Sequence, residues 1–363
     1  MNKTRRALIT GGAGFIGSHL SRHLLKGGWQ VTIIDDLSTG RRSNIQDLEK
    51  RPGFRMVIGS ITNKTVMNRL VSECDVCFHL AAAVGVQLIV HDAVHTIETN
   101  IAGTEAVLKI ANRHRKKVLV ASTSEVYGKS DNDQFSEDDD MILGPTCKSR
   151  WSYACSKAID EFLALAYHKK HHLPVVIVRL FNTVGPRQTG AYGMVVPRFV
   201  KQALLNEPIT VYGDGQQSRC FGYVEDVVRG IIALSEEPRA VGQVFNLGST
   251  NEITIEKLAH RVISLTRSKS KLVFVPYDKA YESGFEDMRR RVPNISKAGK
   301  LIGYRPTVGL EEIIRRVAAD IRKELAAEHR SRDFARRKPL SHLCLDRDAD
   351  KRARAGKKRA NAA

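Results

Sequence analysis

A glycine-rich turn separates the first apolar run of the chain from the helical pattern that follows it. The run Arg6–Thr10 leads directly into Gly11-Gly-Ala-Gly-Phe-Ile-Gly17, and a helical pattern continues from Ser18 to Lys26. The first, second and third of these spaced glycines permit a tight turn, a close backbone approach to a pyrophosphate, and close packing of the helix on the strand. A phosphate would face the free N–H groups of the helix amino terminus. The motif therefore predicts a strand–turn–helix unit able to hold a dinucleotide.

Short β-branched runs alternate with helical patterns through the first half of the chain. After Arg6–Thr10 the runs are Val31–Ile34, Met56–Ile58, Val76–Leu80, Val118–Ala121 and Val175–Arg179. Strands joined by helix-length connections form right-handed βαβ units. The pattern predicts an α/β fold, a Rossmann-type doubly wound parallel sheet.

Shorter elements rich in glycine and proline follow the strand at 175–179. Because 244–247 again has the pattern of a sheet strand, the smaller C-terminal substrate lobe is expected to be discontinuous. The predicted domains are an NAD-binding domain over 1–180, with a returning strand near 244–247, a nucleotide-sugar lobe over 181–325 and a tail over 326–363.

The tail accounts for part of a formal net charge of +19. The chain after Ala326 is rich in Arg and Lys, ends with Lys351–Arg359, and has few aromatic residues. Such a composition predicts disorder. The tail could contact RNA, an anionic membrane surface or an acidic partner, although a solvated appendage with no specific role is the preferred interpretation. The folded part is also basic, which suits an anionic substrate.

Membrane and metal functions have little support in the sequence. No apolar run reaches the eighteen or so residues of a membrane span, and the amino terminus enters a strand pattern instead of a signal peptide, so a cytoplasmic location is expected. Among six cysteines the one close pair, Cys74 and Cys77, lies in a predicted strand. Buried thiols are favoured over zinc ligands, and no metal is expected.

Two carboxylates end the second predicted strand. Asp35 or Asp36 can hydrogen-bond the adenosine ribose and repel a 2′-phosphate, which favours NAD. Arg41 and Arg42 lie close by in sequence and leave NADP as an alternative.

A second group of residues predicts hydroxyl oxidation. Thr123 and Glu125 follow the fifth strand, and Tyr153 and Lys157 are spaced i and i+4 on a predicted helix. In this arrangement the lysine lowers the pKa of the phenol and holds a ribose, the tyrosine takes a proton from a substrate hydroxyl, and the threonine hydrogen-bonds that hydroxyl.

With these motifs the chain resembles the extended short-chain dehydrogenase/reductase superfamily, in its nucleotide-sugar-modifying members, from about residue 5 to residue 320. Further matching segments are His79–Ala82, Thr99–Thr104, Phe181–Arg187, Val211–Gly215 and Arg219–Asp226. The resemblance implies a homodimer through helices near 100–112 and 153–167, although these apolar faces could instead belong to the core.

The resemblance also implies a set of site residues. Cofactor contacts are expected from Gly11, Gly14, Phe15, Ile16, Gly17, Asp35, Asp36, Leu80, Ala81, Asn100, Tyr153 and Lys157. Substrate contacts are expected from Ser124, Asn182, Arg187, Tyr212, Arg219 and Arg291. For Arg219 and Arg291 the alternative is solvation or an ion pair with a neighbouring acid.

Within the superfamily the UDP-glucuronate decarboxylases and their relatives are most similar. The shared segments are Ser122–Gly128, Arg150–Lys157 and Phe285–Pro293. In those enzymes the residues matching Glu125 and Arg291 orient the uronate and handle its protons, so the expected catalytic residues are Thr123, Glu125, Tyr153, Lys157 and Arg291. The expected reaction is oxidation at C4, loss of the C6 carboxylate as carbon dioxide, and formation of a UDP-pentose such as UDP-xylose.

Several alternatives remain open at this point. A UDP-sugar 4-epimerase would not need Glu125, and an NDP-sugar 4,6-dehydratase usually carries adjacent Asp and Glu where this chain has Ser124 and Glu125. Met194 replaces an arginine common in xylose-forming decarboxylases, and Ser60 stands where an Asp often contacts the adenine. A nucleotide-sensing or RNA-binding regulator is the non-enzymatic alternative.

Overall fold

The computed structural model describes residues 4–84, 92–190, 193–280 and 288–337. The chain divides into two units, residues 1–320 and residues 321–363. The sheet, the small lobe and the cavity described below all belong to the first unit.

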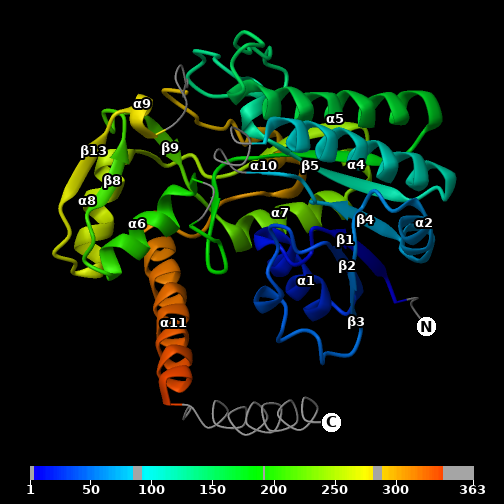
Figure 1. Cartoon of the computed structure of the whole chain (residues 1–363). Helices are drawn as coiled ribbons and strands as arrows, with labels where there is room; N and C mark the ends of the chain where they lie inside the picture. Colours follow the sequence, from blue (N-terminus) through cyan, green and yellow to red (C-terminus); the bar gives the residue numbers. More distant parts are fainter. Residues whose placement is uncertain (1–3, 85–91, 191–192, 281–287, 338–363) are drawn as a thin grey trace, which may run out of the picture. The chain divides into compact units, whose positions relative to one another are not determined.

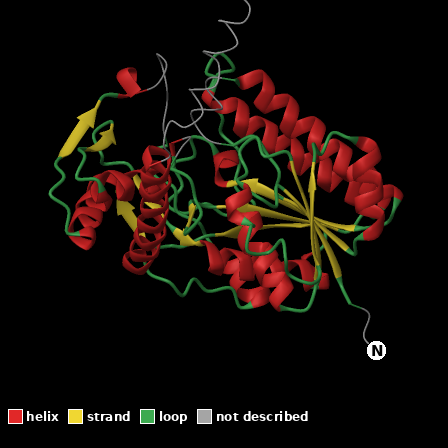
Figure 2. Cartoon of the chain, turned by 60° about the horizontal axis from the view of Figure 1, so that its bottom comes forward, coloured by secondary structure: helices red, strands yellow, loops and turns green. Residues whose placement is uncertain are grey.

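A seven-stranded sheet forms the centre of the first unit (Figures 1 and 2). Its order is β11-β6-β5-β4-β1-β2-β3, and every neighbouring pair is parallel. The strands are β1 (Arg6–Thr10), β2 (Gln30–Asp35), β3 (Phe54–Ile58), β4 (Val76–His79), β5 (Lys117–Thr123), β6 (Val175–Leu180) and β11 (Gln243–Leu247). The strand order reverses between β1 and β4, so the predicted doubly wound fold is confirmed.

Helices cover both faces of this sheet (Figure 2). Helix α4 packs against α5 and α2 on one face, and α1 packs against α7 on the other. Buried strand residues such as Leu8, Val118 and Ile177 form one apolar cluster with Val107 and Leu108 of α4. The bounds are α1 (Phe15–Lys26), α2 (Lys64–Glu73), α4 (Ala93–Arg113), α5 (Arg150–His171) and α7 (Val224–Glu236).

Smaller elements form the rest of the first unit. Three two-stranded sheets pair β7 (Thr183–Val184) with β10 (Gly222–Tyr223), β9 (Ser218–Cys220) with β12 (Glu252–Thr254), and β8 (Ile209–Tyr212) with β13 (Leu272–Val275). The helices are α6 (Val195–Leu204), α8 (Ile255–Thr266), α9 (Tyr277–Ala280) and α10 (Ser296–Ile302), with 3-10 turns η1 (Arg42–Asn44), η2 (Ser124–Tyr127) and η4 (Pro238–Ala240). Strand β11 is the strand expected to return to the main sheet.

The expected disordered tail begins too early in the sequence-based division. Helix α11 runs over Leu310–Arg337, so residues 326–337 are helical. Strong helix formers dominate this stretch, and an ion pair of 2.8 Å joins Glu312 to Arg316 one turn later in the same helix. Residues 338–363 lie outside the described part.

The remaining global expectations concern membranes and cysteines. No described helix is long and apolar enough to cross a membrane. Cys74 and Cys77 are free and buried, and burial raises the pKa of Cys74 to about 12. They are therefore core thiols, as predicted. No group of His, Cys, Asp or Glu in the described ranges has an arrangement that could hold a metal ion.

Candidate active site

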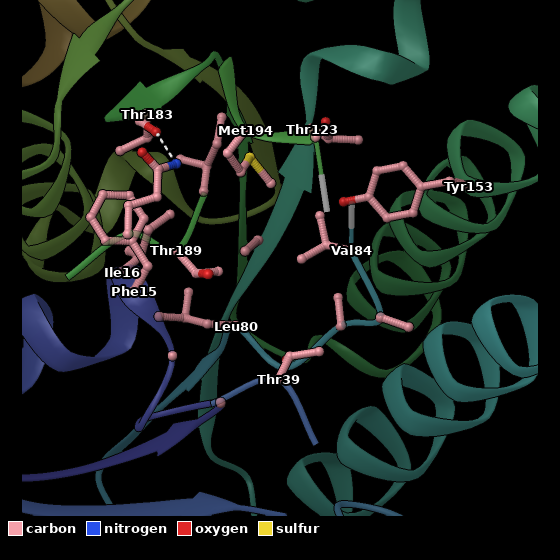
Figure 3. Close-up of a pocket in the computed structure, with 18 of the residues that line it drawn as sticks. Phe15, Ile16, Thr39, Leu80, Val84, Thr123, Tyr153, Thr183, Thr189 and Met194 are labelled. Atoms are coloured by element: carbon pink, nitrogen blue, oxygen red, sulfur yellow. Dashed lines mark hydrogen bonds between the residues drawn. The ribbon is translucent and has the colours of Figure 1, made fainter. Parts of the chain in front are cut away.

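A cavity of about 740 Å³ opens beyond the carboxyl ends of the sheet strands (Figure 3). Its walls come from the turn before α1, from the ends of β2, β4, β5 and β6, and from the lobe elements α6, β8 and β9. It adjoins β1 and β4, where the strand order reverses, which is the usual ligand position in doubly wound sheets. A cavity of this size can enclose much of a ligand of several rings.

The glycine turn meets the cavity with almost no space to spare. Gly11 has φ +68°, and a Cβ at this position would lie 2.9 Å from the Cα of Ala81. A Cβ on Gly17 would lie 2.3 Å from the carbonyl oxygen of Gly11. Only glycine fits these two positions, so the backbone can form a cradle for a pyrophosphate.

The two carboxylates after β2 differ in exposure. Asp35 is buried and accepts hydrogen bonds of 2.9 Å from the backbone N–H groups of Ala13 and Leu37. Burial raises its pKa, against these two bonds. Asp36 is exposed and accepts from Ser38. Both line the cavity, with Asp35 fixing the turn and Asp36 open to a ribose.

The two arginines that left NADP open do not line the cavity. Arg42 pairs with Glu49 at 2.7 Å, and Arg41 donates a hydrogen bond of 2.8 Å to Thr189. Ser60 does line the cavity, and its hydroxyl lies 2.8 Å from that of Thr62. This end of the cavity favours an unphosphorylated ribose.

Tyr153 projects into the cavity from the first turns of α5. It is 6 % exposed, and its hydroxyl hydrogen-bonds Thr123 at the end of β5. Figure 3 shows the hydroxyl pointing into the cavity, with Thr123 beside it and Met194 on the opposite side. The predicted base and its hydroxyl partner therefore come together although thirty residues of chain separate them.

The predicted effect of Lys157 on this phenol is not what the structure shows. Burial, followed by the charges of Glu125 and Asp160, raises the pKa of Tyr153 instead of lowering it. Lys157 is buried, does not line the cavity, and pairs with Asp160 at 2.7 Å. A sequence spacing of i and i+4 could not reveal this counter-ion.

Glu125 lies between two guanidinium groups. Its carboxylate oxygens are 2.5 Å from Arg150 Nη2 and 2.8 Å from Arg291 Nη1. Burial alone would raise the pKa of Glu125, but the charges of Arg150 and Arg291 outweigh burial and bring it to about 2. The carboxylate is therefore ionised at neutral pH, and the three side chains together carry one net positive charge.

Arg150 was absent from the expected site residues. It precedes Tyr153 by three positions, so the two share a face of α5. This spacing, together with its place in Arg150–Lys157, was the signal available in the sequence.

Two further expectations are wrong about access to the cavity. Asn100 is buried and does not line it; its side chain accepts a 2.8 Å hydrogen bond from the N–H of Ala83 and thereby holds the loop after β4. Arg187 does not line it either. The backbone N–H of Arg187 donates to Asp320 at 2.6 Å, and its guanidinium lies 3.5 Å from His19 on α1.

The other expected residues of the substrate end do line the cavity: Ser124, Asn182, Tyr212, Arg219 and Arg291. So do the expected cofactor residues Gly14, Phe15, Ile16, Leu80 and Ala81. Gln188 and Thr189 also line it and were missed, because no local pattern marks them. The segment 285–287 of the motif around Arg291 lies outside the described residues.

Comparisons with known proteins agree with this geometry. The family model for GDP-mannose 4,6 dehydratase matches residues 8–317. A UDP-N-acetyl-alpha-D-glucosaminuronate decarboxylase of Bacillus cytotoxicus is 45% identical over 309 residues, which cover 85% of this chain and 95% of the relative. UDP-glucuronic acid decarboxylase 1 of Xenopus tropicalis is 36% identical over 335 residues, covering 92% and 76%.

Solved structures give the same result. Pal from Bacillus thuringiensis has a TM-score of 0.81 at 32% identity, and the match covers 88% of this chain and 99% of that one. UDP-glucuronic acid 4-epimerase from Bacillus cereus, solved with UDP-glucuronic acid and NAD, has a TM-score of 0.79 at 32% identity with the same coverage. The chain belongs to the GDP-mannose 4,6 dehydratase-like family of extended short-chain dehydrogenases/reductases.

Proposed function

We propose that this enzyme uses NAD to oxidise C4 of a UDP-hexuronate and releases C6 as carbon dioxide, yielding a UDP-pentose. The observation that carries the proposal is the ion-pair trio of Glu125, Arg150 and Arg291, in the same cavity as Thr123 and Tyr153. An epimerase needs the second pair but has no need of the trio.

The residues present fit a dinucleotide. Gly11 and Gly17 leave the turn without side chains where a pyrophosphate would approach, and Asp36 is open to a ribose. NAD supplies an acceptor for the C4 hydride and gives it back at the end of the cycle. NAD is also present in the solved epimerase at 32% identity.

The chain's own groups then perform the proton transfers. Tyr153 takes the proton of the C4 hydroxyl while Thr123 orients that hydroxyl. The sugar becomes a β-keto acid, and cleavage of the C5–C6 bond releases carbon dioxide and leaves an enolate. Protonation at C5 and return of the hydride to C4 complete the UDP-pentose, and Tyr153 returns its proton to the C4 oxygen.

The trio provides for the uronate carboxylate. Because Glu125 is ionised, it acts in this state as an acceptor that orients Arg150 and Arg291. The surplus positive charge attracts the C6 carboxylate, and a planar guanidinium can bind it through two parallel hydrogen bonds. As carbon dioxide leaves, that attraction is lost, which favours product release.

The sugar itself has two candidates. The Bacillus cytotoxicus relative, at 45% identity, is a decarboxylase of UDP-N-acetylglucosaminuronate, and the Xenopus relative, at 36%, is a decarboxylase of UDP-glucuronate. Met194, where an arginine was expected, makes this wall of the cavity apolar and uncharged. We therefore place the 2-acetamido sugar first and UDP-glucuronate second.

The test is incubation with NAD and each UDP-uronate in turn. We expect stoichiometric carbon dioxide, a UDP-pentose and no net NADH. A C4-epimerised uronate with no carbon dioxide would establish the epimerase alternative, and a lack of turnover with either sugar would favour the regulator. Tyr153→Phe removes the base and should lower turnover by about 10²–10⁴-fold. Tyr127→Phe is the matched control, because the Tyr127 hydroxyl bonds Asn246 and does not line the cavity.

A homodimer through α4 and α5 is a second part of the proposal. These adjacent helices expose the large apolar residues Val94, Ile97, Ile159 and Phe162. Phe162→Glu should give a monomer in light-scattering measurements, whereas Ile58→Glu, an equally exposed site on β3, should not change the mass. A dimer that persists in Phe162→Glu would rule out this face.

Two expectations remain predictions. One is a cytoplasmic location, and the other is contact of the basic tail with an anionic partner. Removal of residues 338–363 should leave sugar turnover unchanged, and a loss of RNA binding on removal would identify the tail as an accessory.

A further inference from the structure

A buried carboxylate with no part in the chemistry above lies next to Lys157. Asp160 is fully buried, and its Oδ2 is 2.7 Å from Lys157 Nζ, one turn earlier on α5. The two charges offset each other in a site that water does not reach. A buried ion pair is costly to form, so its presence beside the proposed base calls for a physical reason.

The other contacts of Asp160 lead to the glycine turn. Asp160 accepts a hydrogen bond from Thr104 of α4. The Thr104 hydroxyl lies 3.1 Å from Nε2 of His79, and Nδ1 of His79 lies 2.8 Å from the hydroxyl of Thr10, which accepts from the N–H of Ala81 at 3.1 Å. This polar chain therefore joins the centre of α5 to the ends of β1 and β4.

The direction of the donors in this polar chain is determined. His79 is neutral, because burial brings its pKa to about 3. Since the N–H of Ala81 donates to Thr10, the threonine hydroxyl can donate to Nδ1 of His79. The other ring nitrogen then donates to Thr104, and Thr104 donates to Asp160. Every donor points toward the carboxylate, which must be ionised to accept from both Thr104 and the lysine.

We propose that Asp160 is a positioning residue that holds the Lys157 ammonium and offsets its charge, and so sets the pH at which Tyr153 gives up its proton. The inference rests on the proposed function, in which Tyr153 is the base. In a short-range view of the motif the lysine alone governs the phenol; here the carboxylate governs how much of that charge reaches it.

Other charged groups also face the phenol. They are Glu125 from η2, Arg150 and Lys157 from α5, His95 from α4, and Arg219 and Arg291 from the lobe side of the cavity. Burial, then Glu125 and Asp160, raise the pKa of Tyr153, while the Thr123 hydrogen bond and Arg150 lower it. Of the two carboxylates, Asp160 alone offsets the lysine, so its removal changes the lysine's influence without disturbing the Glu125 trio.

The test is Asp160→Asn, which keeps the shape and removes the charge. In the NAD-bound protein labelled with ¹³Cζ-tyrosine, the resonance missing from Tyr153→Phe identifies the phenol, and its titration is followed to the alkaline limit of the fold. We expect the midpoint to fall by about one pH unit or more, as for removal of one charge near a buried group. The rate of C4 oxidation, measured as NADH absorbance in a single turnover, should rise at correspondingly lower pH. Asp160→Glu should restore the later titration.

A matched control separates this effect from loss of stability. Asp226 is buried on α7, pairs with Arg229 at i+3 and does not line the cavity. Asp226→Asn should lower the melting temperature and leave the Tyr153 midpoint unchanged. If Asp160→Asn behaves in the same way, with a lower melting temperature and the wild-type midpoint, Asp160 is structural only and the inference is wrong.

A second pair of variants covers the case in which Asp160→Asn does not fold. Lys157→Met leaves Asp160 without its counter-ion, and Lys157→Met/Asp160→Asn removes both charges, an exchange that buried pairs often tolerate. The double variant should titrate about one pH unit earlier than Lys157→Met, and equal midpoints would overturn the inference. Because this titration needs no sugar, its failure is distinguishable from an absence of carbon dioxide in the turnover assay.

Discussion

The two ends of the cavity are built on different physical principles. At the cofactor end the turn from Gly11 to Gly17 is shaped by backbone approach, and carbon atoms are missing where a ligand and a helix need space. At the substrate end Glu125 is held by Arg150 and Arg291, and buried charges take the place of missing atoms. One end is defined by seven consecutive residues, whereas the other unites side chains more than 160 positions apart in the chain.

This difference shows why the family and the reaction are decided at different places. A backbone turn has one shape, so every member with the same cofactor can share it. A buried carboxylate between two guanidiniums needs all three partners, because removing one leaves an uncompensated charge. The substrate end can therefore separate one sugar chemistry from another while the cofactor end stays the same.

Glu125→Gln is the largest expected break in the comparison. Without the carboxylate the two guanidiniums repel each other and the uronate is misplaced, so product formation should fall by about 10²-fold or more. C4 oxidation should fall much less, since Thr123 and Tyr153 are untouched. Stopped-flow NADH absorbance measures oxidation and captured carbon dioxide measures product. Equal losses in the two steps would show that Glu125 has no separate role.

Acid unfolding should reveal the same carboxylate. The folded pKa of Glu125, about 2, lies below its ordinary value of 4.5, so its stabilising contribution is complete above pH 4.5 and is lost as the pH falls toward 2. The contribution is on the order of 3 kcal/mol. Chemical denaturation at pH 6 and pH 3 should show a smaller difference in unfolding free energy for Glu125→Gln than for the wild type. An unchanged difference would mean that other carboxyls account for the acid sensitivity.

Gly17→Ala tests the cofactor end. The added carbon would lie 2.3 Å from the Gly11 carbonyl oxygen, and relief of this clash moves α1 away from β1 at a cost of about 1–3 kcal/mol. NAD affinity, measured by calorimetry, should fall by about 10–100-fold. Gly309→Ala is the control, because no atom lies within 4 Å of its added carbon. Wild-type affinity in Gly17→Ala would show that the turn tolerates a side chain.

Arg150→Lys is the smallest change and sharpens the substrate end. Lysine keeps the charge and loses the planar fork, so we expect a rise of about tenfold in KM for the uronate with a smaller effect on kcat. NAD affinity should not change. A fall in kcat with an unchanged KM would instead place Arg150 in the chemical step.

The residues that the sequence located well are those joined by local geometry. The glycine turn, the parallel sheet and the i, i+4 pair of Tyr153 and Lys157 follow from short spacings, and the fold is confirmed by the strand order. Helix α11 was partly missed, since charge was read as disorder although helix formers and i, i+4 ion pairs dominate the segment.

Contacts between distant segments were beyond the reach of such spacings. The chain does not announce that Asp160 takes the ammonium of Lys157, that Asn100 holds a loop, or that Arg187 turns toward His19. Local spacing was enough for the class of fold and the type of proton transfer, because a turn or one helix face depends on neighbours in sequence. Which charges surround Tyr153 depended on the packing of α4, α5 and the lobe, because electrostatic effects depend on distance in space and on burial.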